Sequence, residues 1–550
     1  MSDANGQQLP PGWAIAPIED LFWPLDDGRT LHQGWSPLCE KTPAPTDEDW
    51  GVLKTTAIQA GAFLPQHNKQ LPKHLSPRPQ TEVKTGDILI TCAGPRVRCG
   101  VACMVRHTRP RLMMSGKMYR FRVSPDHMDA RYLEAFLLTP KATSAIDKMK
   151  TGGNDSGLNL THDRFRPLSV PVAPLNEQRR IMDTVEELIS DLDAGVAALE
   201  QVQAKLKHYR AALLKAAVEG ALTAEWRAKH PAAEQASALL TRILAERRRR
   251  WEEAQLKKFK EAGKAPPKDW KAKYQEPTAP ITDGLPTLPS GWCWASPEQL
   301  ASPDAYSLAI GPFGSNLKVT DYTSEGVPLI FVRNIRSGIF DDRKTHFVSN
   351  GKAAELRAHR VFPGDLLITK MGDPPGDARL YPLDKPDAIL TADCIKMTLS
   401  PQLADHSYFC HVVNSILVKK QIAQITKGVA QLKVSLGRFA SIALPLPCAQ
   451  EHSAIVECVE EQLSVIEHLE ADLEAKLKSA QALRQSILRH AFTGQLVPQD
   501  PQDEPAAELL ERIAAQREEL ARQALAAKKT KPKAPPKRAA RQTGKRHSHD

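Results

Sequence analysis

A stretch from Glu177 to Gly220 constrains the fold more than any other feature, because its apolar residues recur at alternating steps of three and four. These residues are Ile181, Val185, Leu188, Leu192, Val196, Leu199, Val202, Leu206, Tyr209 and Leu213. Asn176 is a suitable N-cap, and Gly220 is a suitable stop. A helix of about forty residues would be about 60 Å long, so one compact domain cannot cover it. The pattern predicts a coiled-coil helix that needs a partner.

The chain contains that partner, because the same pattern returns between Glu451 and Gly494. An ungapped alignment pairs Phe165 with Phe439, Pro171 with Pro445, Ile181 with Ile455, and Gly220 with Gly494. Two further motifs occur twice, LPPGW (9–13) with LPSGW (288–292), and KTGDILITC (84–92) with FPGDLLITK (362–370). The chain is therefore an internal duplication.

The duplication predicts an α+β protein with an internal pseudo-two-fold repeat. Two globular domains, mixed α/β with a β-rich core, should alternate with two long helices that pack as an antiparallel coiled coil. The expected segments are a first globular domain (1–175), a central long helix (176–230), a charged helix with a proline-rich linker (231–283), a second globular domain (284–449), a C-terminal long helix (450–497), and a charged helix with a disordered basic tail (498–550).

The charge balance favours an acidic partner. The 550 residues carry a formal charge of +10, and the pI is near 9.0, which suits nucleic acid first and an anionic membrane second. The first residues are polar, and no stretch approaches the roughly twenty apolar residues that a membrane span requires. We therefore expect a soluble cytoplasmic chain with no membrane partner.

The sequence shows no catalytic motif. It lacks a phosphate-binding Gly-x-x-x-x-Gly-Lys-Ser/Thr loop, a Gly-x-Ser-x-Gly elbow and a cysteine or histidine set at zinc-ligand spacing. The segment GDPPG (372–376) is similar to the Asp-Pro-Pro motif of adenine amino-methyltransferases, which continue with an aromatic residue that stacks on the flipped base. Gly376 stands in that aromatic position, so a turn is the favoured interpretation. We expect no catalytic or metal site in this chain.

Cations and glycine-rich loops in both halves are candidates for DNA contact, because arginine pairs with guanine edges and phosphates, and loop amides can approach phosphates closely. The alternative for each residue is an ordinary solvated surface. The predicted DNA-binding residues are Arg96, Arg98, Lys117, Arg120, Lys150, Gly152, Gly153, Asn154, Ser315, Asn316, Lys318, Arg333, Asn334, Lys370, Lys427, Gln431 and Lys433.

Nearly the whole chain resembles the specificity subunits of type I restriction-modification systems. The resemblance rests on the repeated LPxGW and Gly-Asp motifs, on GPFGS (311–315), on PLNEQ (174–178), and on helices that end in EGALT (219–223) and TGQLV (493–497). It implies that each globular domain is a target-recognition domain that reads one half of a bipartite, asymmetric site in double-stranded DNA. The chain itself would be a non-catalytic part of a complex that is a site-specific deoxyribonuclease and a DNA adenine methyltransferase.

The resemblance also implies partners. The long helices would dock two methyltransferase subunits, and restriction and translocase subunits would join them. S-adenosylmethionine, ATP and magnesium would belong to these partners, with no cofactor in this chain. The helix positions assigned to partner binding are Glu177, Gln178, Ile181, Leu188, Gly220, Glu451, Ile455 and Gly494.

Two other interpretations remain open from sequence. The chain could be a stand-alone DNA-modifying enzyme of the adenine methyltransferase type, in which case the isolated chain would bind the methyl donor. It could instead be a coiled-coil adaptor without affinity for DNA.

If the helices set the spacing of the two half-sites, lengthening both should lengthen the unread spacer. Seven residues inserted near Gly195 and near Leu469 preserve the heptad pattern and add roughly 10 Å to each helix. At about 3.4 Å per base pair, the spacer should grow by up to about three base pairs while both half-sites stay the same. Sequencing of methylated sites measures this, and an unchanged spacer in an active complex would contradict it.

Overall fold

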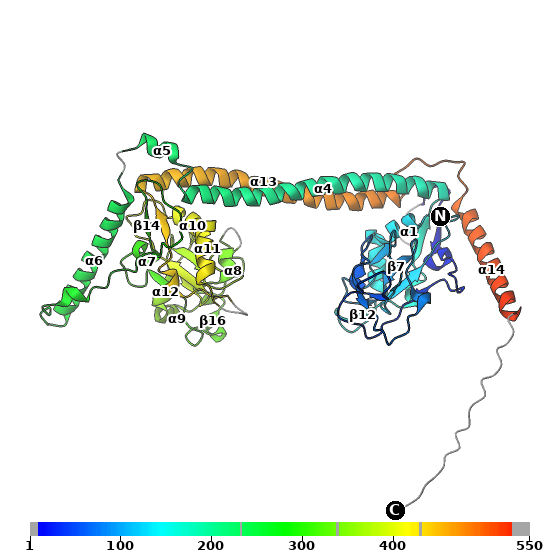
Figure 1. Ribbon diagram of the computed structural model, residues 1–550, viewed down its shortest axis with the longest axis horizontal. Helices are drawn as coiled ribbons and strands as arrows, with labels where there is room; N and C mark the ends of the chain where they lie inside the picture. Colours follow the sequence, from blue (N-terminus) through cyan, green and yellow to red (C-terminus); the bar gives the residue numbers. More distant parts are fainter. Residues whose placement is uncertain (1–8, 232–233, 337–339, 428–431, 531–550) are drawn as a thin grey trace, which may run out of the picture. The chain divides into compact units, whose positions relative to one another are not determined.

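The computed structural model describes residues 9–231, 234–336, 340–427 and 432–530. The chain forms two compact units (Figure 1). Unit 1 comprises Met1–Ala198 and Ala475–Asp550, and unit 2 comprises Leu199–Glu474. Both boundaries fall inside long helices, so each unit contains a part of each helix. The basic tail expected at the end of the chain lies outside the described residues.

Unit 1 is built on an antiparallel sheet in the order β2 (His32–Gln33), β11 (Met118–Phe121), β7 (Ile88–Thr91) and β9 (Ala102–Met104). A second sheet has the order β10 (Leu112–Met113), β3 (Gly51–Leu53) and β6 (Asn68–Gln70), with β10 and β3 parallel. Three ribbons join β1 (Ala14–Pro17) with β13 (Ser169–Val172), β8 (Ala93–Gly94) with β12 (Leu158–Asn159), and β4 (Ile58–Gln59) with β5 (Ala62–Phe63). Its short helices include η1 (Ile18–Leu21), α1 (Ala130–Leu137), α2 (Pro140–Met149) and α3 (His162–Phe165).

Unit 2 repeats this plan. Its antiparallel sheet has the order β15 (Leu308–Ile310), β23 (Cys394–Met397), β20 (Leu366–Thr369) and β21 (Ala378–Leu380). The second sheet has the order β16 (Tyr322–Thr323), β18 (Phe347–Val348), β17 (Val327–Ile330), β22 (Ala388–Leu390) and β19 (Arg360–Val361). A ribbon joins β14 (Cys293–Ala295) with β24 (Leu444–Leu446), and the helices include α7 (Pro297–Leu300), α8 (Val332–Arg336), α9 (Asn350–Glu355), α10 (Ser407–Asn414), α11 (Ile416–Ile425) and α12 (Leu436–Phe439).

The two predicted long helices are α4 (Leu175–Val218) and α13 (Ala449–Ala491). The shorter helices that follow them are α5 (Ala224–Lys229) and α6 (Ala236–Glu261) after α4, and α14 (Ala506–Thr530) after α13. In unit 2, Arg210 pairs with Glu470 at 3.0 Å, and farther along the chain Thr223 donates to Glu451 at 2.6 Å. The partner number falls as the residue number rises, which confirms the antiparallel packing. Away from the globular parts the seam is only half-covered, and Val202 of α4 is 43% exposed.

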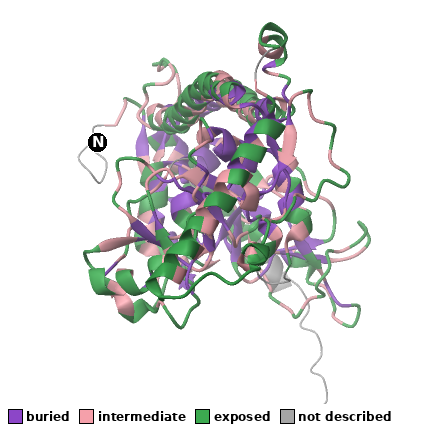
Figure 2. Ribbon diagram, turned by 90° about the vertical axis from the view of Figure 1, so that its left-hand side faces the viewer, coloured by how far each residue is buried: buried purple, intermediate pink, exposed green. Residues whose placement is uncertain are grey.

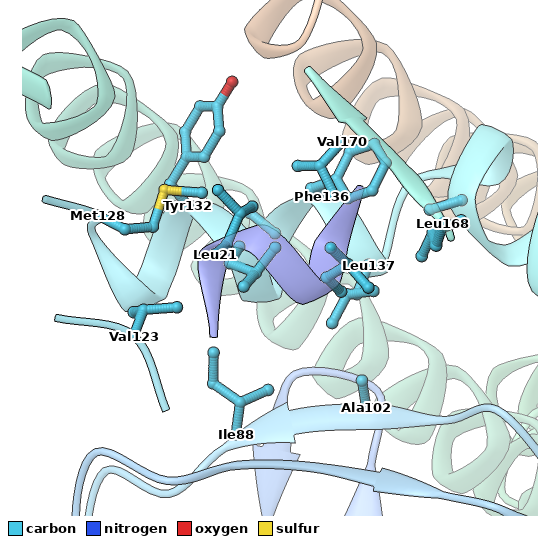
Figure 3. Packing of buried hydrophobic residues seen from close by; sticks show 14 of the residues in the cluster. Leu21, Ile88, Ala102, Val123, Met128, Tyr132, Phe136, Leu137, Leu168 and Val170 are labelled. Atoms are coloured by element: carbon cyan, nitrogen blue, oxygen red, sulfur yellow. The ribbon is translucent and has the colours of Figure 1, made fainter. Parts of the chain in front are cut away.

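Each globular core is closed by the start of one long helix and the end of the other. In unit 1, Tyr132 and Phe136 of α1 lie beside Leu21 and Ile88 (Figure 3). The residues that close this core from the helices are Ile181 and Val185 of α4, Ile487, Leu488 and Ala491 of α13, and Leu509 and Ile513 of α14. In unit 2, Leu214 and Ala217 of α4, Ile455 and Val459 of α13, and Leu239 and Ile243 of α6 do the same. Figure 2 shows buried residues in purple inside the globular region and exposed residues in green on outer helix surfaces.

The repeated LPxGW motif ties these segments together. The Trp13 indole N–H donates to Glu177 at 3.0 Å, and the Trp292 indole N–H donates to Glu451 at 2.8 Å. The glycine that ends the opposite helix packs on the proline of the motif, and its φ is positive, 68° at Gly494 and 70° at Gly220. A Cβ at Gly494 would lie 2.3 Å from Pro10, so only glycine fits there.

The two halves differ at the residue that follows Glu177 in unit 1 and Glu451 in unit 2. Gln178 is fully buried, accepts from the backbone N–H of Asp129 at 3.0 Å and donates to the carbonyl of Ala173 at 2.8 Å. His452 occupies the equivalent position in unit 2, stacked on Tyr408 with 4.8 Å between ring centroids. Neither of its ring nitrogens has a hydrogen-bond partner within the described residues, and burial lowers its pKa to about 3.

A His452→Gln exchange should therefore stabilise unit 2, because a buried polar group without a partner costs about 1–3 kcal/mol. The pKa of His452 in the folded chain lies below the unfolded value of about 6.5. As the pH falls from 6.5 towards 3, this imidazole therefore gains a proton only in the unfolded chain. In the wild type this removes up to about 1.4 kcal/mol of stability per pH unit, and the exchange should reduce that slope. The measurement is calorimetric unfolding of the full chain between pH 5 and pH 8.

The matched control is Gln178→His, which deprives Asp129 and Ala173 of their partners. It should destabilise unit 1 by about 1–3 kcal/mol and add to the loss at low pH. Effects of the same sign for both exchanges would contradict the explanation.

Candidate nucleic-acid interface

One end of the main sheet in unit 1 brings three separate segments together. Cys92, just after β7, donates its backbone N–H to the carbonyl of Lys117 at 2.8 Å. Its own carbonyl accepts from the N–H of Leu160 at 2.8 Å. The loop after β7, the turn before β11 and the glycine-rich loop from residue 151 to residue 160 therefore form one surface, and the Arg96 N–H donates to the carbonyl of Asp155 within it at 2.9 Å.

A glycine brings a fourth segment to this end. Gly34 follows β2 and crosses the backbone of residues 114 and 115 so closely that a Cβ would lie 2.3 Å from the carbonyl oxygen of Ser115. The loop that continues from Gly34 is held by the side chain of Ser36, which accepts from the N–H of Gly116 at 2.9 Å. Gln33 donates to the carbonyl of Gly116 at 2.7 Å.

Unit 2 forms the same surface with different side chains. Lys370 takes the position of Cys92, donating its N–H to the carbonyl of Asp393 at 2.8 Å and accepting from the N–H of Val434 at 3.0 Å. Gly311 takes the position of Gly34, and a Cβ there would lie 2.0 Å from the backbone of Thr391. The Lys370 ammonium donates to the carbonyl of Ala392 at 3.2 Å, beside this crossing. We call these surfaces the loop edges of unit 1 and unit 2.

Eleven of the predicted DNA-binding residues are exposed: Arg96, Lys117, Gly152, Gly153, Asn154, Ser315, Asn316, Lys318, Arg333, Lys427 and Lys433. Most of them lie on a loop edge. Arg96 joins the loop of Asp155 by an ion pair of 3.0 Å, and Lys433 pairs in a β-bridge with Met371. Gln431 lies outside the described residues.

Four predicted contacts turn inward instead, and we correct their assignment. Arg98 donates to the carbonyls of Thr55 and Ile58, the latter at 2.6 Å, and to the Gln59 side chain at 3.1 Å. Lys150 bonds the carbonyl of Arg96 at 3.0 Å and Asp147 at 2.9 Å, and its side chain is 8% exposed. The two others are Asn334 and Arg120, which are both buried. These side chains hold the loops in place.

Arg120 has a structural equivalent that explains its burial. It lies 3.5 Å from Asp87, the aspartate of the first Gly-Asp motif, while Lys396 lies 3.9 Å from Asp365 of the second. Each aspartate also caps its own turn, accepting from the N–H of Lys84 at 2.7 Å or of Phe362 at 2.8 Å. Burial raises the pKa of both aspartates and lowers the pKa of both cations. In each pair, the charged form of one group is therefore stabilised by the opposite charge of the other.

The helix positions assigned to partner binding are also corrected in part. Glu177, Gln178, Ile181, Glu451 and Ile455 are buried inside their own units, so they have no side-chain surface to offer a partner. Gly220 and Gly494 end the helices against the LPxGW prolines. Only Leu188, 38% exposed, keeps an accessible side chain.

Sequence inspection noted Gly311 only as part of GPFGS, did not pair it with Gly34, and missed Asp393. The glycine crossings could not be found because their flanking residues, His32 and Gln33 against Ala309 and Ile310, share no identity. Asp393 stands where unit 1 has Lys117, so the two loop edges differ in charge at an equivalent position.

The GDPPG segment forms a turn beside the loop edge of unit 2. The N–H of Gly376 donates to the Thr369 hydroxyl at 2.9 Å, and its φ is 96°. A Cβ at Gly376 would lie 2.8 Å from Ile422, so the aromatic residue of a methyltransferase motif does not fit there. Within the described residues, no group of three His, Cys, Asp or Glu side chains could hold a metal ion.

Comparison with known proteins finds similarity to type I restriction enzyme specificity subunits. The chain is 36% identical over 216 residues to the type I restriction enzyme EcoEI specificity subunit of Escherichia coli, covering 39% of this chain and 35% of that protein. It is 23% identical over 530 residues to the EcoKI specificity subunit of Escherichia coli strain K12, covering 93% of this chain and 96% of that protein. No protein-family model matches the chain.

A solved structure shares the fold. A chain from a study of the complex assembly and conformational transition of the type I R-M system superposes with a TM-score of 0.60 at 16% identity, covering 89% of this chain and 100% of that chain. The fold thus defines a class of proteins with two globular parts joined by paired long helices. The similar curated proteins are type I restriction enzyme specificity subunits, which agrees with the resemblance predicted from sequence.

Among the helices that the described residues form, none has the length and apolar character to cross a membrane.

Arg96 and Arg98 provide a prediction, because they are two residues apart and point in different directions. Arg98→Ala removes the donors for two carbonyls and should destabilise unit 1 by about 1–3 kcal/mol. Arg96→Ala breaks only exposed ion pairs, which are worth about 0–1 kcal/mol, so it should leave stability nearly unchanged and weaken DNA binding. Thermal unfolding and DNA titration of both variants measure this. Equal losses of stability would contradict the inward assignment of Arg98.

Proposed function

We propose that this chain is the DNA sequence-specificity subunit of a type I restriction-modification complex. The observation that carries the proposal is the pair of loop edges, which present exposed cations and loop amides on one scaffold used twice. Each edge would read one half of a bipartite site in double-stranded DNA. Because the side chains at equivalent positions differ, the two half-sites would differ, as an asymmetric site requires.

The chain would act without catalysing a reaction. Two methyltransferase subunits would dock on the long helices, on outward positions such as Leu188 rather than on the buried glutamates. Restriction and translocase subunits would complete a site-specific deoxyribonuclease and adenine methyltransferase in the cytoplasm. S-adenosylmethionine, ATP and magnesium would be bound by these partners.

Neither alternative gains support. A stand-alone methyltransferase would need an aromatic residue at position 376, where a Cβ would already lie 2.8 Å from Ile422. A coiled-coil adaptor without DNA affinity gives no reason for two loop edges on the same scaffold with different side chains.

The proposal is tested by sequencing the methylated genome of a host with and without this chain. Methylation at one split, asymmetric motif should disappear when the chain is removed and return when it is restored. Methyl transfer by the purified chain alone, or an unchanged methylation pattern, would overturn the proposal.

The loop edge of unit 2 gives a quantitative prediction. If Lys318 and Lys433 contact phosphates, changing both to alanine should weaken binding to all sequences about equally and reduce the salt dependence of log Kd by about 0.9 per lost contact. The measurement is DNA titration at several salt concentrations, using the chain with its methyltransferase subunits.

The control is an equal change of charge elsewhere in unit 2. Lys257 of α6 is exposed, and its side chain lies 4.0 Å from Glu261 on the same helix. Lys257→Ala together with Lys258→Ala should leave the salt dependence unchanged. A similar change for both double variants would mean that net charge, rather than the loop edge, determines binding.

A further inference from the structure

The loop that follows each crossing glycine carries an apolar side chain in open solvent, although Val97 after β7 and Val319 beside Lys318 are exposed as well. Phe313 is 71% exposed and stands two residues after the crossing glycine Gly311, while Leu38 is 91% exposed and stands four residues after Gly34. Scattered exposed apolar residues are common on protein surfaces and mean little singly. Here the loop after the crossing glycine provides one in each half of a duplicated fold, although its distance from the glycine and the surrounding sequence differ.

The loops that carry these side chains are held by backbone contacts. Gly311 is fixed on the backbone of Thr391, and the N–H of Asn316 donates to the carbonyl of Phe313 at 2.8 Å, which closes a turn at the tip. In unit 1, Ser36 is bonded to Gly116, and the N–H of Glu40 donates to the carbonyl of Gln70 at 3.1 Å. Each apolar side chain is therefore presented from a defined position, and ordering it on binding costs little entropy.

The surroundings of both tips are cationic and polar. Lys318 lies on the loop of Phe313, and Lys370 bonds the carbonyl of Ala392 beside the glycine crossing. In unit 1, exposed Lys117 follows Gly116. A single ring is far too small for a protein interface, which buries about 1,200 Å² or more. An apolar tip on a loop with nearby cations instead suits DNA, whose phosphates lie on either side of a groove lined by base edges and thymine methyl groups.

We propose that Phe313 and Leu38 are specificity-determining residues that contact the bases of the second and first half-sites, while the neighbouring lysines contact phosphate. The proposal rests on the proposed function. It assigns to each unit one apolar base contact that is absent from the DNA-binding residues predicted from sequence. Because such a contact releases no counterions, its loss should lower affinity without changing the salt dependence.

The test uses the full chain with its methyltransferase subunits and DNA that carries the methylated motif. Phe313→Ala should weaken binding by about tenfold or more and relax the motif only in the second half-site, with an unchanged salt dependence. Phe313→Leu, which keeps an apolar tip, should retain most of the affinity. Leu38→Ala should act on the first half-site alone.

The matched control is Leu383→Ala. Leu383 is 83% exposed on another loop of unit 2, where it lies against the turn of Gly364, and its loss should change neither affinity nor motif. Unfolding temperatures of all variants should match the wild type, because the truncated side chains are exposed. The inference is overturned if Phe313→Ala binds like the wild type, or if both half-sites weaken equally. If the wild type itself shows no bipartite motif, the proposed function fails instead.

Discussion

The bond from a buried tryptophan to a buried glutamate at the start of each long helix is the contact on which the rest of the structure depends. It places a carboxylate at a helix N-terminus, where the helix dipole favours negative charge. In unit 2, Glu451 also accepts from Thr223 and Arg227, which follow the end of the other helix. In unit 1, Val497 stands where Thr223 would be, so one oxygen of Glu177 has no partner among the described residues, and burial raises the pKa of this carboxyl group.

Because of this contact, neither unit is a continuous piece of chain. The first globular part needs the end of α13 and α14 to close its core, and the second needs the end of α4 and α6. A cut at the linear boundary between the halves would remove core residues from both units. The helices are thus part of each hydrophobic core, as well as a coiled coil.

The sequence predicted this architecture because its signals are periodic or repeated. A heptad pattern specifies a helix and its buried face, and an ungapped repeat specifies which segments correspond. Side-chain direction in loops has no such signal. Arg96 and Arg98 look alike in sequence, yet Arg98 is turned inward by acceptors between residues 55 and 59, more than thirty-five positions away. The same holds for Arg120, whose burial follows from Asp87.

The duplication separates scaffold from recognition in a way that one sequence without a repeat could not. Residues that are the same in both halves, such as the LPxGW tryptophans and the Gly-Asp aspartates, are buried and hold the fold. Equivalent positions on the loop edges differ in type, as Cys92 against Lys370 and Lys117 against Asp393, while differences in the core, such as Gln178 against His452, are buried. In a duplicated chain, the residues that folding requires stay the same in both halves, while the residues on the exposed loop edges can differ. Differences between equivalents on the exposed loop edges are therefore the positions that bear on the proposed recognition of DNA, more than any shared motif.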